Sequence, residues 1–123
     1  MSILLDSFAF MEIFKGSALG KKFLGIMHGK RLFTAITCLF EVYYRTIDLY
    51  GFEKADEYFK YIEQNCKVVN LDNETVREAG ELKAKEKLHA LDALMLACAR
   101  LNSLAVLSGD AHLKGKKNVI YLE

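Results

Sequence analysis

Carboxylate side chains follow both of the clearest apolar runs in the sequence. Asp6 comes directly after Ile3-Leu4-Leu5, and Asp110 follows the run from Leu104 to Leu107 after Ser-Gly. Asp92 precedes the second run, at the predicted start of a helix. If the runs are parallel strands, their carboxyl ends meet at one edge of a sheet, where we expect all three aspartates. Carboxylates this close repel one another unless one is protonated or a cation lies among them, and Mg²⁺ and Mn²⁺ prefer such oxygen ligands.

Each aspartate also has a purely local explanation. Aspartate is a favoured helix N-cap, so Asp6 could cap the helix that follows it, and Asp92 could do the same for its own helix. Asp110 could be an ordinary turn residue in Ser-Gly-Asp. Capping alone does not require a carboxylate after both of the clearest strands, so the joint pattern favours an acidic site.

Glu41 is not singled out by helical periodicity. It lies in a helix predicted over residues 36–50, on the side opposite the apolar face. Spacing alone therefore predicts a solvated glutamate paired with Arg45 four residues later. The apolar face itself is made by Ile36, Leu39, Tyr43, Ile47 and Tyr50.

The elements that must position these residues alternate between short apolar runs and longer helical patterns. Alternation of this kind predicts an α/β fold of three layers, α/β/α, with a central, mostly parallel sheet of about five strands. Ser7 can cap the first helix, which ends at Gly16. Strands are predicted near residues 3–5, 31–34, 68–69, 104–107 and 118–122, and the other helices near 18–28, 36–50, 53–65, 73–87 and 93–101.

Composition limits the remaining possibilities. With 123 residues, of which 52% are hydrophobic, the chain is expected to form a single domain over residues 1–123 with a packed core. The net charge of +1 excludes binding through bulk positive charge, so any contact with nucleic acid must be local. The three cysteines, which lie far apart, favour reduced thiols over a disulfide framework or a zinc site. With no targeting segment or membrane span apparent, we expect a cytoplasmic protein without membrane contact.

Taken together, these residues resemble the PIN-domain nucleases, in particular the VapC-type toxins of toxin–antitoxin pairs. The similarity covers nearly the whole chain, with the acidic residues in the family's order and at its spacing. The most specific part is the C-terminal one, where an Asp-Ala-Leu helix precedes an apolar strand and Ser-Gly-Asp-Ala-His-Leu. The segments that carry the resemblance are Ile3–Ser7, Ile36–Glu41, Leu91–Ala99 and Leu104–Asp110.

The resemblance implies a metal-dependent endoribonuclease with a PIN-like fold. It also implies an RNA substrate, a cognate antitoxin protein as partner and a homodimer, for which the aromatic residues of helices 36–65 could supply the surface. The implied cofactor is Mg²⁺ or Mn²⁺, which would activate the attacking water and polarise the phosphoryl oxygen. The implied catalytic and metal-binding residues are Asp6, Glu41, Asp92 and Asp110, supported by Ser7 and Ser108.

Contacts with substrate are less clearly marked by the sequence. The segment after Asp6 is aromatic where the family usually has small and aliphatic residues, and His112-Leu113 replaces a common aromatic pair. RNA needs positive charge near the acids, and Lys15 and Lys114 are candidates to supply it. His112, close to Asp110, could contact the substrate as well.

Three other functions stay open at this point. The chain could be a non-catalytic module that binds RNA or protein on the same fold, although such a module has no reason to keep clustered acids. It could be a housekeeping PIN nuclease that processes RNA rather than a toxin. A phosphoacceptor signalling domain is disfavoured, because Ser108-Gly109 stands where that class needs a lysine.

Overall fold

The computed structural model describes residues 1–123 and contains five strands, six α-helices and one short 3₁₀ helix. The strands are β1 (Ser2–Leu5), β2 (Arg31–Ala35), β3 (Lys67–Val69), β4 (Ala105–Ser108) and β5 (Val119–Tyr121). The helices are α1 (Ser7–Lys15), α2 (Ala18–Met27), α3 (Ile36–Tyr50), α4 (Phe52–Asn65), α5 (Asn73–Glu86) and α6 (Ala90–Leu101), and the 3₁₀ helix is η1 (Ala111–Leu113).

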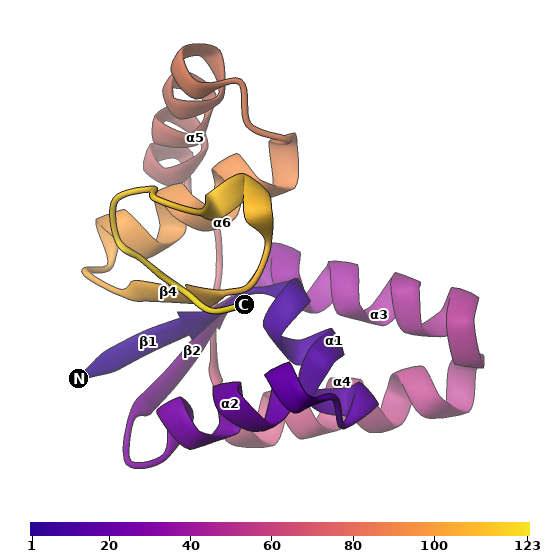
Figure 1. Cartoon of the computed structure of the whole chain (residues 1–123). Helices are drawn as coiled ribbons and strands as arrows, with labels where there is room; N and C mark the ends of the chain where they lie inside the picture. The colour runs from indigo at the N-terminus through magenta and orange to yellow at the C-terminus, as the bar shows by residue number, and fades with distance from the viewer.

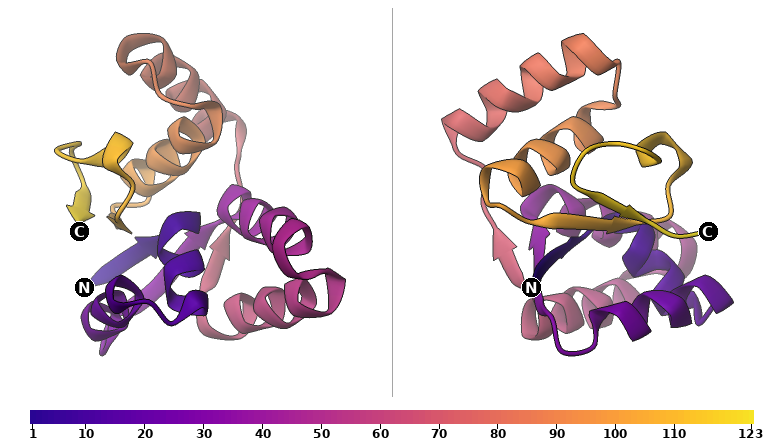
Figure 2. Two further views of the ribbon diagram at one scale, coloured as in Figure 1. Left: turned by 45° about the vertical axis from the view of Figure 1, so that its right-hand side comes forward. Right: turned by 60° about the vertical axis from the view of Figure 1, so that its left-hand side comes forward.

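The five strands form one sheet in the order β3-β2-β1-β4-β5, and every neighbouring pair is parallel. Helices α5 and α6 lie on one face of the sheet, while α1, α2 and α4 lie on the other (Figures 1 and 2). The predicted three-layer α/β/α fold with a mostly parallel sheet of about five strands is therefore confirmed.

A separate hydrophobic core fills the space on each side of the sheet. Because alternate residues of a strand point to opposite faces, Leu4 packs beneath α5 and α6, whereas Ile3 and Leu5 pack against α1 and α2. Helix α3 contributes to both cores, with Cys38 in the first and Leu39 in the second. This double packing fixes the position of α3 relative to the ends of β1 and β2.

Two local predictions need correction. Ser7 does not cap α1: Asp6 is the N-cap, and its carboxylate accepts a hydrogen bond from the Ala9 amide, which leaves the Ser7 hydroxyl free for another partner. Asp92 does not begin its helix either. Helix α6 starts at Ala90, after His89 at the N-cap position, so that Asp92 lies in the first turn.

The cysteines agree with what the sequence predicted. All three cysteines are buried and free, as the absence of pairing motifs predicted. None of the helices combines the length and the apolar character that a bilayer crossing demands.

Candidate active site

The candidate site lies where the strand order of the sheet changes direction. The chain moves outward from β1 to β2 and β3, and then returns to place β4 on the other side of β1. Asp6 follows β1 and Asp110 follows β4, so these two carboxylates come from adjacent parallel strands. The carboxyl ends of strands at such a switch point form the usual binding crevice of an open α/β sheet.

Asp6 is buried and held on both of its carboxylate oxygens. Its Oδ1 accepts the Ala9 amide hydrogen bond at 2.8 Å, and its Oδ2 accepts a short hydrogen bond from the Ser108 hydroxyl. The same Ser108 oxygen accepts a hydrogen bond of 3.0 Å from the Asp110 amide. Asp6 therefore caps α1 and belongs to the site at once, and Ser108 connects it to the loop that carries Asp110.

Glu41 reaches the same region from α3. Its Oε1 accepts a hydrogen bond of 2.5 Å from the Ser7 hydroxyl, and its Oε2 lies 3.7 Å from Arg45 Nη1. The predicted pairing with Arg45 is thus present, but the Glu41 side chain is only 22% exposed and is not an ordinary solvated group. Because β2 runs into α3 without a loop, the first turns of α3 stand directly beside the end of β1.

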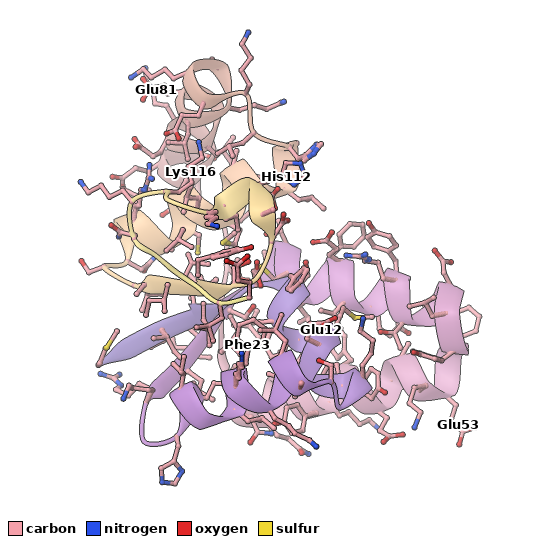
Figure 3. All side chains as sticks on the ribbon, in the orientation of Figure 1. Glu12, Phe23, Glu53, Glu81, His112 and Lys116 are labelled. Atoms are coloured by element: carbon pink, nitrogen blue, oxygen red, sulfur yellow. The ribbon has the colours of Figure 1, made fainter.

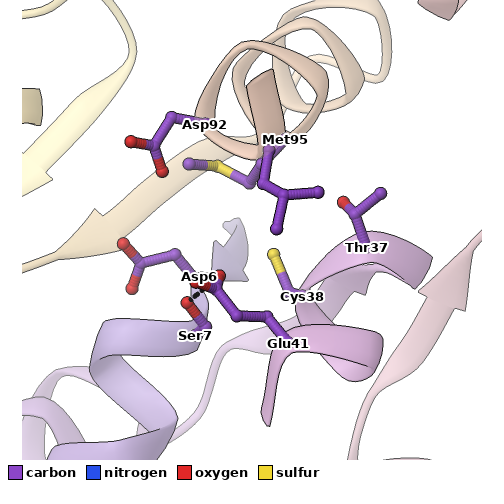
Figure 4. Close-up of a pocket in the computed structure, with 8 residues that line it drawn as sticks. Asp6, Ser7, Thr37, Cys38, Glu41, Asp92 and Met95 are labelled. Carbon is purple, nitrogen blue, oxygen red and sulfur yellow. Dashed lines mark hydrogen bonds between the residues drawn. The ribbon is translucent and has the colours of Figure 1, made fainter. Parts of the chain in front are cut away.

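One cavity of about 370 Å³ collects all four predicted acids. Its walls come from the start of α1, the middle of α3, the start of α6 and the segment after β4. At its inner end, Asp6, Glu41 and Asp92 line a smaller hollow of about 10 Å³ (Figure 4). The acids of the cavity are Asp6, Glu41, Asp92 and Asp110.

The electrostatics of this cavity oppose full ionisation. The pKa of Asp6 is raised to about 7, chiefly by burial and also by the charges of Asp110 and Asp92, although the hydrogen bonds from Ser108 and Ala9 stabilise the carboxylate and lower it. Burial also raises the pKa of Asp92, and Asp110 and Glu41 add to the rise. When they are ionised, the carboxylates repel one another, which raises the free energy of the folded chain. A bound proton or cation would relieve this repulsion.

The structure separates the three predicted substrate contacts. His112 lines the acidic cavity, with its Nδ1 2.9 Å from Asp110 Oδ1. Lys15 lies outside that cavity and lines a neighbouring hollow. Lys114 lines neither space and instead pairs with Glu123 at 3.4 Å.

Sequence patterns did not single out several residues that line the acidic cavity. Arg45 was foreseen only as an ion-pair partner, although it is also part of the wall. Phe8 and His89 were not foreseen, and the His89 ring meets the His112 ring edge-on at 5.3 Å between centroids. The only signals for them were the nearness of Phe8 to Asp6 and of His89 to Asp92 in the chain. Those intervals also suit ordinary core and surface residues.

The four carboxylates of the cavity are the side chains that could hold a divalent metal ion. As the side chains stand, no three His, Cys, Asp or Glu residues form a group that could hold a metal ion. The chemistry of the donors fits Mg²⁺ or Mn²⁺, because all four are carboxylates around one cavity and two have raised pKa values. The Thr37 hydroxyl, which lines the inner hollow, is buried without a hydrogen-bond partner. The inner hollow therefore offers one hydroxyl oxygen without a hydrogen-bond partner next to carboxylates that repel one another.

No curated protein matches the chain in sequence. The fold is similar to that of a toxin–antitoxin complex from Klebsiella pneumoniae, with a TM-score of 0.80 at 18% identity over 96% of this chain and 95% of the other. It is also similar to VapBC2 from Rickettsia felis bound to a promoter DNA fragment, with a TM-score of 0.78 at 13% identity over 99% and 98% of the two chains.

A third similar structure is VapC20 from Mycobacterium tuberculosis, described as a sarcin–ricin loop-cleaving toxin. It has a TM-score of 0.76 at 15% identity over 89% of this chain and 90% of the other. Identities this low establish a shared fold and nothing more. The sequence itself, however, matches the family model of the PIN domain over residues 3–118, a segment that includes all four acids of the cavity. By this match the chain belongs to the PIN domain family.

Proposed function

We propose that the chain is a Mg²⁺- or Mn²⁺-dependent endoribonuclease that hydrolyses RNA phosphodiester bonds, with residues 1–123 forming one catalytic domain. The observation that carries the proposal is the convergence of four carboxylates, from four separate parts of the chain, on one cavity at the switch point of the sheet. A fold stabilised by burial alone gains nothing from such mutual repulsion. A cation site explains why the acids stand together.

The roles of the acids follow from their surroundings. Asp6, Asp92 and Asp110 would hold the metal, and Glu41 would complete the site. When bound, a divalent ion polarises a phosphoryl oxygen and lowers the pKa of the attacking water. The protein contributes orientation: Ser108 and the Ala9 amide fix Asp6, while Ser7 fixes Glu41. Attack in line with the leaving 3′ oxygen forms one P–O bond as the other breaks, and gives 5′-phosphate and 3′-hydroxyl ends.

RNA as the substrate and an antitoxin as the partner are further parts of the proposal. A similar structure is described as a toxin that cleaves the sarcin–ricin loop, which supports RNA. Several similar structures are toxin–antitoxin complexes, which supports a toxin held inactive by a cognate antitoxin over a housekeeping nuclease. We also propose a homodimer, because α3 exposes a stripe of large apolar side chains.

The test is cleavage of a labelled single-stranded RNA by the purified chain with Mg²⁺, Mn²⁺ or EDTA. We expect cleavage only with a divalent metal, 5′-phosphate ends, and loss of cleavage in Asp6→Asn and Asp110→Asn. Asp48→Asn is the matched control, since Asp48 is an exposed acid on α3 outside the cavity. Cleavage by both cavity variants at the wild-type rate would contradict the proposal. RNA binding that EDTA does not change, without cleavage at any metal concentration, would instead favour a binding module.

A further inference from the structure

A second hollow adjoins the acidic cavity and shares two of its wall residues. This hollow, of about 180 Å³, lies between α1 and α3. Phe8 and Arg45 line both the hollow and the acidic cavity, and we call these two adjoining spaces the groove. Figure 3 labels His112, which lines the cavity, and Glu12, which lines the hollow. The residues that line the hollow are Phe8, Met11, Glu12, Lys15, Arg45 and Leu49.

The spacing of these residues explains the shape of the groove. Phe8, Met11 and Lys15 follow one another at intervals of three and four residues along α1, and Arg45 and Leu49 are four apart on α3. Residues at such intervals share one helix face, so two facing helix surfaces form the walls. From Phe8 to Lys15 the helix rises about 10 Å. The groove therefore extends away from the acids along α1 by roughly two helical turns.

Phe8 is held in place at the junction of the two spaces. A Cβ atom added at Gly109 would lie 2.6 Å from Phe8 Cε1, so the ring packs directly against the backbone between Ser108 and Asp110. The ring is still partly exposed, and it lines both spaces. An aromatic group is thus fixed beside the acids by the same loop that carries Asp110.

We propose that this hollow is a nucleotide subsite, which receives the base next to the bond that the acids cleave; the proposal rests on the ribonuclease function proposed above. Phe8, Met11 and Leu49 offer apolar contact to the face of a base, as single-strand binding sites do. The volume of about 180 Å³ is larger than the cavity of about 150 Å³ that is known to hold benzene. The hollow can therefore accept an aromatic ring.

Charge favours a nucleotide over an apolar peptide in this hollow. The four carboxylates repel the phosphates of RNA. Arg45 is the basic residue that lines both the acidic cavity and the hollow, so it can offset this repulsion where the two spaces meet. Its contact with Glu41 is long, at 3.7 Å, and the side chain is 49% exposed, so it is free to turn to a phosphate. Lys15 lies at the far end, 2.6 Å from Glu12, and is 52% exposed. A flanking phosphate thus finds a cation on either side of the base.

Leu49 gives the cleanest test, because it is 63% exposed and does not line the acidic cavity. We compare Leu49→Ala with Tyr50→Ala, a change at the next residue of α3, which is 56% exposed and lies outside the hollow. The probes are a short single-stranded RNA and versions in which one nucleotide at a time beside the cleaved bond lacks its base. Cleavage gives kcat and KM separately, and fluorescence anisotropy in EDTA gives binding without cleavage.

We expect Leu49→Ala to raise KM by about five- to tenfold with kcat nearly unchanged, since the partial burial of a leucine side chain against a base contributes this order of affinity. Removing the base at one flanking position should raise KM for the wild type by at least this factor, and by a smaller factor for Leu49→Ala, in which the base has already lost one of its three apolar contacts. Arg45→Ala should also raise KM, whereas Arg77→Ala on α5 should not. Tyr50→Ala should behave as the wild type does.

The subsite proposal is overturned if the wild type cleaves RNA but Leu49→Ala and every abasic RNA behave as their controls do. It is equally overturned if Leu49→Ala leaves KM for RNA unchanged and weakens only the binding of a protein partner. If the wild type neither cleaves nor binds RNA with any divalent metal, the ribonuclease proposal itself fails, and the subsite falls with it. The three results are distinguishable in the same set of measurements.

Discussion

At the scale of single residues, Asp6 combines two tasks that sequence patterns treat as alternatives. It caps α1 through Ala9, and it stands in the acidic cavity with Ser108 on its other oxygen. Asp6 is therefore the N-cap of α1 and a wall residue of the acidic cavity at once. The cap orients the carboxylate, and the cavity raises its pKa.

This raised pKa makes stability depend on pH in a defined direction. Asp6 has a pKa of about 7 in the folded chain against 3.8 in the unfolded one, so between these values the folded state binds a proton that the unfolded state releases. Without metal, stability should therefore fall as the pH rises from about 4 to about 7, and level off above. Asp6→Asn removes this cost and should stabilise the chain at pH 8 by about 2–4 kcal/mol, with little effect near pH 4.

Urea unfolding in EDTA at the two pH values measures the difference. Adding Mn²⁺ at pH 8 should stabilise the wild type and leave Asp6→Asn almost unchanged, because the ion relieves the repulsion that the substitution has already removed. An equal stability difference at both pH values would show that the Asp6 charge does not carry this cost.

Ser108 should act on the reaction through Asp6. Ser108→Ala removes the hydroxyl that stabilises the Asp6 carboxylate, so the pKa of Asp6 should rise further. Activity at neutral pH should fall by about tenfold to a hundredfold, the usual cost of losing a group that orients a metal ligand. The rising limb of the pH–rate profile should move to higher pH, which a merely structural defect would not produce. Ser2→Ala, at the other end of β1, is the control and should leave the profile unchanged.

At the scale of elements, helices α1 and α2 pack closely together at Gly20, and α1 is the helix that begins next to Asp6. A Cβ atom at Gly20 would lie 2.3 Å from the Glu12 carbonyl oxygen, whereas one at Gly25, in the same helix, would meet nothing within 4 Å. Gly20→Ala should therefore destabilise the chain by about 1–3 kcal/mol through overpacking. Gly25→Ala should stabilise it by about 0.5–1 kcal/mol, since alanine favours the helix. Thermal unfolding of both variants decides the matter, and equal shifts would contradict the packing explanation.

The sequence predicted most elements of the fold, because apolar runs and helical spacing are local signals. The same locality explains the errors. Ser7 and Asp6 are both good caps, and only the completed fold shows that Ser7 donates to Glu41 instead. The start of α6 was placed too late, since Ala90 and Leu91 are good helix formers without a marked cap before them.

The four acids could be grouped before the structure was known, because strand ends and family spacing brought them to one edge. The other residues that line the cavity could not be predicted in this way. The junction formed by Phe8 and Arg45 depends on how α1 lies against α3, and no local pattern encodes the relation of two helices. Lys15 and Lys114 looked equivalent as basic residues, yet only Lys15 lines the hollow that adjoins the acidic cavity, while Lys114 pairs with Glu123.

At the scale of the whole molecule, α3 serves both the site and an exposed face. Glu41 and Arg45 line the acidic cavity. Ile36, Phe40 and Tyr44, spaced four residues apart, are 38%, 59% and 39% exposed, and the last two rings lie 5.2 Å apart. Contiguous apolar side chains on a surface mark an interaction site, and a two-fold axis would bring two copies of this stripe together.

Phe40→Glu should convert the proposed homodimer into a monomer, because the substitution places two carboxylates at the centre of the contact, where each meets its own copy. Leu101→Glu, a change of the same kind at the end of α6 on a side chain that is 41% exposed, is the control and should leave the dimer intact. Light scattering after gel filtration measures the mass of each form. Because Glu41 follows Phe40 directly, circular dichroism and thermal unfolding must show that α3 is retained in the variant. A wild type that is monomeric at every concentration, or a Phe40→Glu variant that still dimerises, would assign the α3 stripe to some other contact.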